Sequence, residues 1–352
     1  MEYIIFLVYL IFLGLNIIYF LGVFYKFPEK SNRVSFENTI ALVPARNEGL
    51  GVLRAVSSLQ LQGFKYIYVV ANNCVDDTVE VCKKNKIDYL DLYFGKEWNG
   101  KDTALKLAVS LLSKKFPGYN FLCVDSDVYI NDRIKEAMQY LNDNFASFPV
   151  YGLNIESRLV RLSNFLFDYV YRLNRGLQFV FGRSLAVGSV FYIPGSRVYE
   201  FLNYDVVSKV EDLERSFVHK FDFIDLVVGK TMLPFEFYDI IKQRLRWFSG
   251  WFVIPFERFK IVFKNVWAFP LFLVFYFSVF QLFFSLLNGI FLRYVFGLYF
   301  SVIMVINRNN KNILDYLMFP WFLIFNMLLG FFSLFVKVQW KDTKGGIISE
   351  KV

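Results

Sequence analysis

Long apolar stretches near the two ends of the chain constrain its fold more than any other sequence feature. Residues 3–24 form an almost unbroken apolar run, and residues 267–287 and 313–336 form two more. A helix needs about 20 consecutive apolar residues to cross the hydrocarbon core of a bilayer. The 44 Phe and 22 Tyr of the chain are also more than a soluble core alone requires, and aromatic side chains gather where helices meet lipid. The pattern predicts membrane-spanning helices on both sides of a more polar section.

The charges beside these runs predict how the chain would lie in a membrane. Basic residues follow the first run between residues 26 and 33, and lysines fill the tail at 337–352. Because basic residues concentrate in cytoplasmic loops, we expect the N-terminus outside and the polar section and tail in the cytoplasm. That arrangement needs three spans, whereas a shorter run at 290–306, interrupted by Arg293, would make four; the sequence leaves the number open. A signal peptide fits the first run poorly, since only Glu2 precedes it and no small-residue cleavage site follows.

Composition argues against several other classes of protein. The net charge of +8 is not accompanied by any recognised nucleic-acid-binding module, so we expect no nucleic acid partner. Basic residues beside membrane spans attract anionic lipid head groups, which makes membrane lipids the expected partner of this charge. Cys74, Cys82 and Cys123 contain no C-x-x-C pair, and His219 alone cannot complete a zinc site with them. We interpret them as reduced structural thiols.

The section between the apolar runs, residues 36–264, has the composition of a globular domain. The expected strands are residues 39–43, 66–71 and 121–124, and the expected helices are residues 51–61, 77–84 and 101–113. Alternating strands and helices predict an α/β domain with a parallel sheet, which binds ligands at the carboxyl ends of its strands. We therefore expect a transmembrane helix at 1–25, this domain ending in interfacial helices, two or three transmembrane segments at 267–336, and a polar tail at 337–352.

An Asp-Ser-Asp sequence, Asp125 to Asp127, follows the third expected strand. Mg²⁺ and Mn²⁺ prefer carboxylate, water and phosphate oxygens, and they often take only one or two protein carboxylates. At a strand end both carboxylates can face one metal and nucleotide site. Aspartates also end strands and cap helices without any ligand. The pair alone fits both interpretations equally.

A second acidic pair, Glu211-Asp212, lies further along the chain. An acceptor hydroxyl is a poor nucleophile until a base removes its proton. One carboxylate opposite the leaving group suffices for a single inverting displacement, and Asp212 is the candidate. Taken alone, the segment fits a solvated, acidic first turn of a helix better.

The third motif is Q-x-x-R-W, formed by Gln243, Arg246 and Trp247. Their i, i+3, i+4 spacing places them on one face of an expected helix. Arg246 could bind a diphosphate through its planar guanidinium, and Trp247 could form a flat wall for a sugar. Arg and Trp are also common on amphipathic helices at a membrane surface, and we assign the aromatic residues at 251–256 to such an interface.

In this order the three motifs resemble the membrane-bound family 2 glycosyltransferases, the group that contains hyaluronan, chitin, cellulose and poly-N-acetylglucosamine synthases. The resemblance covers about residues 38–260 and the flanking apolar runs. It includes segments that look like the family's nucleoside-binding and acceptor-binding loops, at residues 42–48, 69–78, 100–105 and 187–191. The resemblance implies a GT-A-like α/β domain, with a mixed, mostly parallel sheet between helices, flanked by transmembrane helices.

The resemblance also implies a role for individual residues. The nucleotide would be bound by Pro44, Ala45, Glu48, Asn72, Lys101 and Asp125. Asp127 would bind Mn²⁺ or Mg²⁺, and Asp212 would be the catalytic base. The donor and acceptor pocket would be formed by Gly188, Ser189, Gln243, Arg246 and Trp247.

Three residues depart from the family pattern. Asn72 stands where the family normally has an aspartate that accepts a hydrogen bond from uracil, and its amide oxygen can accept only without charge. The resemblance implies a UDP-sugar as donor, and because of Asn72 we keep a GDP-sugar as the alternative. Asp102 and Lys106 replace the small residue and the asparagine that usually follow the lysine. The sequence offers no physical reason for these two changes.

The function that follows from the motifs is an inverting, metal-dependent glycosyltransferase. It would move an N-acetylhexosamine or a hexose to a hydroxyl of a saccharide or lipid-linked acceptor. One alternative is non-processive transfer of a single sugar to a polyprenyl phosphate or another lipid, and a second is an inactive nucleotide-sugar-binding membrane protein. In each case we expect a multi-pass integral membrane protein whose catalytic domain is cytoplasmic.

Overall fold

The computed structural model of the protein describes most of the central section and one helix near the C-terminus. The described residues are 17–31, 34–94, 100–206, 208, 210–257 and 313–333.

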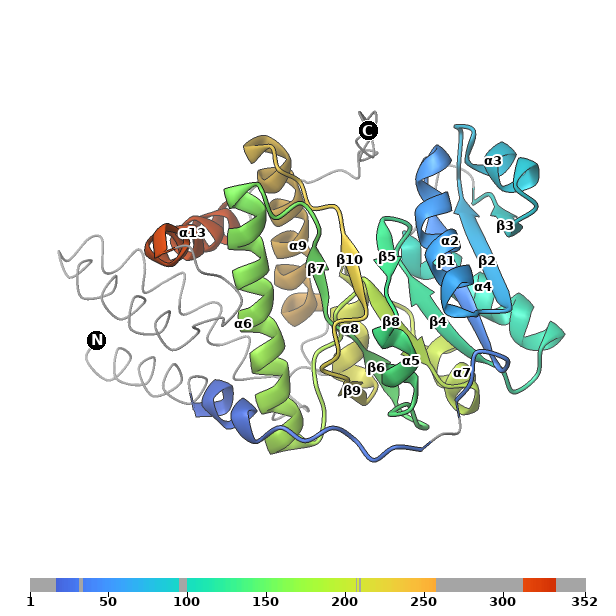
Figure 1. Cartoon of the computed structure of the whole chain (residues 1–352), viewed down its shortest axis with the longest axis horizontal. Helices are drawn as coiled ribbons and strands as arrows, with labels where there is room; N and C mark the ends of the chain where they lie inside the picture. The colour runs from blue at the N-terminus through green and yellow to red at the C-terminus, as the bar shows by residue number, and fades with distance from the viewer. Residues whose placement is uncertain are drawn as a thin grey trace.

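A seven-stranded mixed sheet forms the centre of the molecule (Figure 1). Its strands, in spatial order, are β3 (Asp88–Leu92), β2 (Tyr66–Asn72), β1 (Thr39–Ala45), β4 (Asn120–Val124), β8 (Val190–Ile193), β6 (Phe145–Ser147) and β9 (Phe221–Phe223). Only β8 runs antiparallel to its neighbours β4 and β6; the other pairs are parallel. The mixed, mostly parallel α/β sheet expected from the sequence is confirmed.

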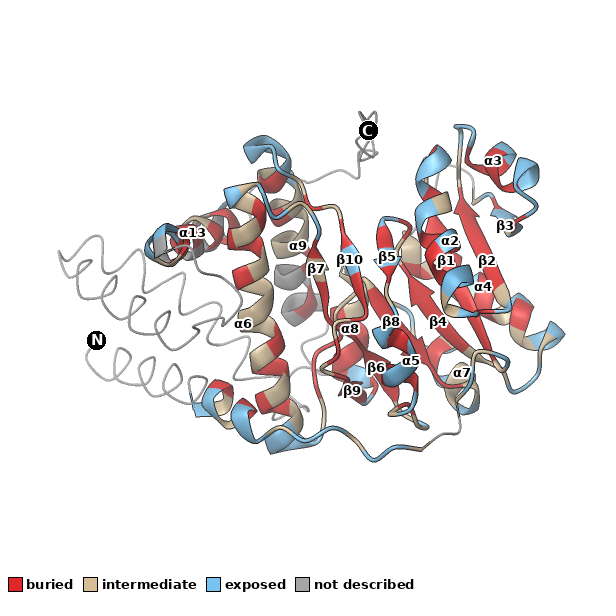
Figure 2. Ribbon diagram, in the orientation of Figure 1, coloured by how far each residue is buried: buried red, intermediate tan, exposed pale blue. Residues whose placement is uncertain are grey.

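Helices cover both faces of this sheet. On one face α2 (Val52–Gln62), α3 (Thr78–Lys84) and α5 (Arg133–Met138) contribute to one apolar core. On the other face α4 (Lys101–Lys115) and α7 (Val198–Leu202) contribute to a second core. All seven residues of β1 are buried, as expected for a strand covered on both sides, and Figure 2 shows the neighbouring strands buried as well. The expected strands and helices of this half agree with the structure to within two residues at each end.

A small second sheet and two further elements complete the part that surrounds the candidate site. The small sheet has the order β5 (Val128–Ile130), β10 (Gly229–Thr231) and β7 (Val150–Gly152). The helix α8 (Glu211–Val218) precedes β9, and short 3-10 helices lie at Gly22–Phe24, Gly49–Gly51 and Gly195–Arg197. Because β5 follows β4 after a three-residue connection, the Asp-Ser-Asp sequence lies between the two sheets.

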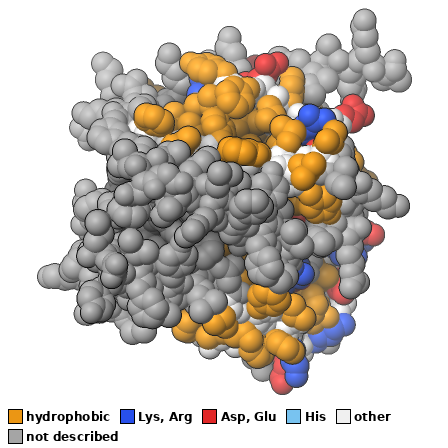
Figure 3. Space-filling view, turned by 90° about the vertical axis from the view of Figure 1, so that its left-hand side faces the viewer, with side chains coloured by type: hydrophobic (Ala, Val, Ile, Leu, Met, Phe, Trp, Pro, Cys, Tyr) orange, Lys and Arg blue, Asp and Glu red, His pale blue; other side chains and the backbone are white. Residues whose placement is uncertain are grey.

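Three long helices form a layer next to the small sheet: α6 (Arg158–Phe181), α9 (Phe237–Glu257) and α13 (Ile313–Phe332). In this layer α6 contacts β7, and α13 packs against α6 and α9 (Figure 1). Phe319 and Phe322 of α13 pack against Leu162 and Phe165 of α6. The carboxylate of Asp315 on α13 is fully buried and accepts hydrogen bonds from the Arg161 guanidinium on α6. Hydrophobic side chains are exposed on this side of the molecule, as Figure 3 shows, and they include Leu314, Leu317, Met318 and Trp321 of α13.

The predicted membrane organisation is contradicted. Among the described residues, no helix has both the length and the apolar character needed to cross a bilayer. The multi-pass integral membrane protein with a cytoplasmic catalytic domain was therefore a wrong prediction, and the flanking transmembrane helices lack support. The physical reason is visible in α13, the described part of the run at 313–336: its buried Asp315 and its Phe319 and Phe322 form a helix–helix interface within the protein, while other apolar side chains of the helix are exposed. The runs at 267–287 and 290–306 and residues 1–16 lie outside the described residues.

Candidate active site

The acidic and basic residues singled out from the sequence meet at the carboxyl edge of the parallel strands. Asp125 follows the last residue of β4, and Glu48 lies in the connection after β1. Lys101 is the first residue of α4, and Asp212 is the second residue of α8. Segments more than 100 residues apart in sequence thus contribute to one cluster at the edge where α/β sheets bind ligands.

Lys101 connects three segments of this cluster. Its ammonium Nζ lies 2.5 Å from Oδ1 of Asp125 and 3.4 Å from Oε1 of Glu211, and it donates a hydrogen bond to the carbonyl of Gly188 at 3.1 Å. Burial by itself lowers the pKa of Lys101, but the carboxylates of Asp125 and Glu211 raise it more, and the net shift is upward. The lysine is therefore a fixed positive charge in the middle of the acidic groups.

The carboxylates around Lys101 carry more negative charge than the lysine neutralises. Burial, with the charge of Asp127 adding to it, raises the pKa of Asp125 to about 6. Burial and the same charge raise the pKa of Glu48 to about 7. Burial also raises the pKa of Asp127, and the charges of Lys101 and Arg246 act in the opposite direction. Burial is the main cause of these upward shifts, and a neighbouring like charge adds to it at Asp125 and Glu48, so a cation bound here would stabilise the ionised carboxylates.

Asp212 is packed against the backbone of Gly188. A Cβ atom added at Gly188 would lie 2.4 Å from Oδ2 of Asp212, so this position admits no side chain while the carboxylate is in place. Burial and the charge of Glu211 raise the pKa of Asp212 to about 7, against the opposing charge of Lys101. A carboxyl with a pKa near neutrality is suited to accept a proton.

The connections after β1 and β2 are held together by short polar contacts. The backbone N–H groups of Glu48 and Gly49 donate to Oγ1 of Thr78, at 3.0 Å and 2.9 Å. The backbone of Asn47 is left-handed, with φ of 56°, and its side-chain oxygen accepts from the N–H of Val75 at 2.8 Å. These contacts fix the backbone of the segment that contains Pro44, Ala45 and Glu48. The contact of these three residues with a nucleotide stays a prediction.

Asn72 has a structural partner that an aspartate could not bind. The residue is the last of β2, is 3% exposed, and donates from Nδ2 to the carbonyl of Gly100 at 3.4 Å. Gly100 immediately precedes Lys101 and has φ of 98°, a left-handed value that favours glycine. Because a carboxylate has no donor, the amide at position 72 helps to place the start of α4.

The Q-x-x-R-W residues lie on α9, and the structure relates them to two different neighbours. Arg246 is close enough to Asp127 for its charge to lower the pKa of that carboxyl. Trp247 faces α6: its ring lies against Phe167, with 6.2 Å between ring centroids, and the guanidinium of Arg244 lies 4.3 Å over the ring. Gln243 is partly buried on the same helix.

Several residues of the site were missed by the sequence reasoning. Arg244, inside the motif but not assigned, is fully buried and donates from Nη2 to Oγ of Ser163 at 3.0 Å. Asp102 and Arg215 form a buried ion pair beside Lys101 and Asp212. The identity of each residue gives no signal for these contacts, because the partners are 81 and 113 positions apart.

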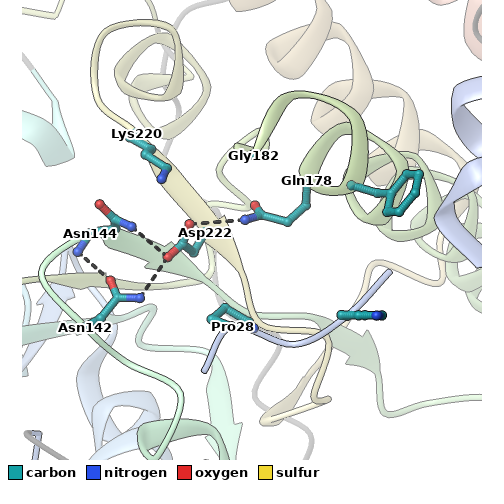
Figure 4. A pocket seen from close by; sticks show the side chains of 9 residues that line it. Pro28, Asn142, Asn144, Gln178, Gly182, Lys220 and Asp222 are labelled. Atoms are coloured by element: carbon teal, nitrogen blue, oxygen red, sulfur yellow. Dashed lines mark hydrogen bonds between the residues drawn. The ribbon is translucent and has the colours of Figure 1, made fainter. Parts of the chain in front are cut away.

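A cavity of about 400 Å³ lies at a different place, where β6 and β9 begin (Figure 4). Since these strands run parallel to each other and in the same direction as β4, their starts lie at the edge opposite to Asp125. In this cavity the carboxylate of Asp222 accepts hydrogen bonds from the side-chain amides of Asn142, Asn144 and Gln178 at 3.0–3.2 Å. The polar side chains at its centre bond one another, and the cavity is separate from the acidic cluster.

Comparison with known proteins agrees with the fold and gives the class of enzyme. Residues 40–205 match the family model described as glycosyl transferase family 2. No curated protein matches the chain. Residues 40–205 are therefore similar to the glycosyl transferase family 2 domain, and the chain is a glycosyltransferase.

Solved structures with a similar fold have low sequence identity. A mannosyltransferase from Pyrobaculum calidifontis, in complex with GDP-Man and Mn²⁺, has a TM-score of 0.65 at 12% identity, covering 93% of this chain and 95% of its own. TarS of S. aureus (1–349) has a TM-score of 0.42 at 15% identity, covering 87% and 98%. Glucosyl-3-phosphoglycerate synthase from Mycobacterium tuberculosis has a TM-score of 0.39 at 10% identity, covering 61% and 81%. The first likeness shows a shared fold over almost the whole chain.

Proposed function

We propose that the glycosyl transferase family 2 domain of this chain catalyses an inverting, metal-dependent transfer of a hexose or N-acetylhexosamine from a nucleoside diphosphate sugar. The acceptor is a hydroxyl of a saccharide or of a lipid-linked acceptor. The observation that carries the proposal is the partly buried cluster in which Asp212 lies within the electrostatic reach of Lys101 and Asp125. It brings a carboxylate suited to accept a proton next to groups suited to bind a charged leaving group.

Asp212 acts as the general base in this proposal. Its carboxylate takes the proton of the acceptor hydroxyl while the hydroxyl oxygen forms a bond to the anomeric carbon of the donor. The bond from that carbon to the diphosphate breaks, and the diphosphate leaves with the electron pair. A single displacement of this kind inverts the anomeric configuration.

Lys101 and Arg246 support the leaving group through their positive charges. Lys101 is held beside Asp125, and Arg246 acts on Asp127, so a diphosphate bound at these aspartates would lie near both cations. Charge that develops on the leaving oxygen is stabilised by fixed positive groups in a site from which water is excluded.

Mn²⁺ or Mg²⁺ fits the excess of carboxylates, with Asp127 and Asp125 as the residues that would hold it. Among the described residues, no group of three or more His, Cys, Asp or Glu side chains is arranged to hold a metal by itself. Mg²⁺ and Mn²⁺ commonly use one or two carboxylates, with phosphate oxygens and water as the remaining ligands. When bound, such a cation neutralises negative charge on the diphosphate.

Two nucleobases, uracil and guanine, are candidates for the nucleotide part of the donor. Asn72 lacks the charge that favours uracil in the family pattern, and its amide is already directed to Gly100. The similar fold of a mannosyltransferase captured with GDP-Man supports testing a guanosine donor beside a uridine donor.

The proposal is tested by donor turnover with Asp212→Asn. Purified protein is incubated with labelled UDP- and GDP-sugars, Mn²⁺ and a panel of saccharide and lipid-linked acceptors, and binding of UDP and GDP is followed by thermal shift, since binding to the folded state raises apparent stability. We expect the variant to bind the same nucleotide and to lose about 100-fold or more in kcat. Equal turnover by Asp212→Asn and the wild type would show that Asp212 is not the base. Nucleotide binding without any transfer by the wild type would favour a binding protein instead.

A further inference from the structure

Two consecutive residues of α4 hold the two sides of the turn that carries Asp212. Lys101 contacts Glu211, the residue before Asp212, at 3.4 Å. Asp102 contacts Arg215, three residues after Asp212: its Oδ1 lies 2.7 Å from both Nε and Nη2 of the guanidinium. The helix α8 is therefore attached to the first turn of α4 by residues on both sides of the candidate base.

The Asp102–Arg215 ion pair is almost completely buried. Arg215 is 1% exposed and Asp102 is 8% exposed. The guanidinium also lies 3.9 Å over the ring of Phe201 and donates from Nη1 to the carbonyl of that residue at 3.0 Å. These partners fix the planar guanidinium from its edge and from its face, so Arg215 has one well-defined position.

The segment that leads into α8 is attached to α4 as well. Lys106, one turn after Asp102, donates to the carbonyl of Tyr204 at 3.2 Å and lies 2.5 Å from Oδ1 of Asp205. The side chain of Glu214 on α8 is 1% exposed and accepts from the Tyr204 hydroxyl at 2.8 Å. Both departures from the family pattern, Asp102 and Lys106, thus make contacts to α8 or to the residues just before it.

We propose that the Asp102–Arg215 ion pair is a positioning device that sets the Asp212 carboxylate against Gly188 and Lys101. The proposal rests on the proposed function of Asp212 as base. The helix α8 has only eight residues, and Asp212 lies in its first turn, where a small rotation would move the carboxylate away from the acceptor. Misplacement of a reacting group by about 1 Å can cost about 100-fold in rate.

A purely structural ion pair is the alternative, and it makes a different prediction. Replacing a buried ion pair by apolar side chains of similar size is often neutral for stability, whereas removing one partner leaves an uncompensated buried charge. If the pair only stabilises the fold, an apolar replacement of both residues restores full activity together with stability. If the pair positions Asp212, the apolar replacement restores stability but leaves kcat low, because the ion pair that joins α4 to α8 is gone.

The experiment compares Asp102→Asn with the double variant Asp102→Leu/Arg215→Met in the full-length protein. For both we expect kcat to fall about 10- to 100-fold, with the donor KM and nucleotide binding within about threefold of wild type. The double variant keeps the test decisive if Asp102→Asn fails to fold. Wild-type kcat in the folded double variant would overturn the proposal, and so would a loss confined to KM.

The matched control is Asp225→Asn, which breaks another ion pair of 2.7 Å, to Arg175 on α6. It should lower stability and keep the wild-type kcat. Asp212→Asn, measured beside it, separates this proposal from the proposed function. Loss of turnover in Asp212→Asn with full kcat in both Asp102 variants means that the base assignment holds and the positioning role does not. Full turnover in Asp212→Asn means that the base assignment itself fails.

Discussion

Lys101 is the cation around which the acidic groups of the candidate site are arranged. It contacts Asp125 and Glu211 and the carbonyl of Gly188, so one side chain ties β4, α8 and the segment before β8. At the scale of single residues, the pKa of each carboxyl of the site depends on how well neighbouring positive charges balance it. Asp212 lies beside the like charge of Glu211, and burial together with that charge raises its pKa to about 7.

The raised pKa of Asp212 predicts an acidic limit for the reaction. The base must be deprotonated to accept a proton, so the rate is half-maximal near pH 7, approaches its maximum well above that pH and declines as the pH falls below it. We expect kcat/KM for the acceptor, at saturating donor, to fall about tenfold for each pH unit well below the pKa. Steady-state kinetics over a range of pH measures this, and nucleotide binding over the same range separates loss of the base from loss of the donor. A flat profile across this range would contradict the role of Asp212.

His219 predicts a second, independent dependence on pH, in stability. Its ring is 5% exposed and stacks on Phe145, and burial, together with the charge of Arg215, lowers its pKa from 6.5 to about 4. The unfolded chain therefore binds a proton between pH 6.5 and 4 that the folded protein does not. The stabilisation is complete above pH 6.5 and is lost as the pH falls toward 4, by about 3 kcal/mol at about 1.4 kcal/mol for each unit.

The measurement for His219 is the free energy of unfolding in urea at neutral pH and near pH 4.5. His219→Phe keeps an aromatic ring against Phe145 and removes the titrating group, so its stability should fall less over this interval than that of the wild type. An identical loss in both proteins would assign the acid sensitivity to carboxylates elsewhere.

At the scale of elements, polar pairs decide how helices dock. The contacts of α4 with α8 are one example, and the contact of α13 with α6 is another. In the second, the fully buried Asp315 is 2.6 Å from Nε of Arg161 and 3.7 Å from Nε of Arg158. Phe319 and Phe322 of α13 also pack against Leu162 and Phe165 of α6, so both polar and apolar contacts join the two helices.

Asp315→Asn is expected to destabilise the protein by about 3 kcal/mol, because it leaves the Arg161 guanidinium without its charged partner at a buried interface. Chemical denaturation followed by circular dichroism measures the loss. Asp239→Asn is the matched control, since Asp239 and Lys242 form an exposed pair of 3.6 Å on α9, with both side chains more than half exposed. A surface pair of this kind contributes at most about 1 kcal/mol. Equal effects of the two substitutions would mean that the contact of α13 with α6 contributes little.

At the scale of the whole molecule, the active cluster and the cavity of Figure 4 lie at opposite edges of one sheet. The acidic cluster gathers several carboxylates around one lysine, whereas the cavity has a polar network whose members bond one another. Charge, rather than hollow volume, therefore identifies the site. The three-helix layer of α6, α9 and α13 closes the molecule on the side of the small sheet (Figure 1).

The sequence by itself determined the α/β domain and the edge of the sheet where Asp125, Lys101 and Asp212 meet. The apolar residues of strands and helices repeat with a period that is visible within a short segment, and parallel strands bring their carboxyl ends to one edge of the sheet. The membrane prediction was wrong because apolar runs look alike whether they face lipid or another helix, as the run that forms α13 illustrates. Only the tertiary structure paired Asp102 with Arg215 and Arg244 with Ser163. Such contacts join residues far apart in the chain, and no local sequence pattern predicts which distant side chain will be the partner of a buried charged group.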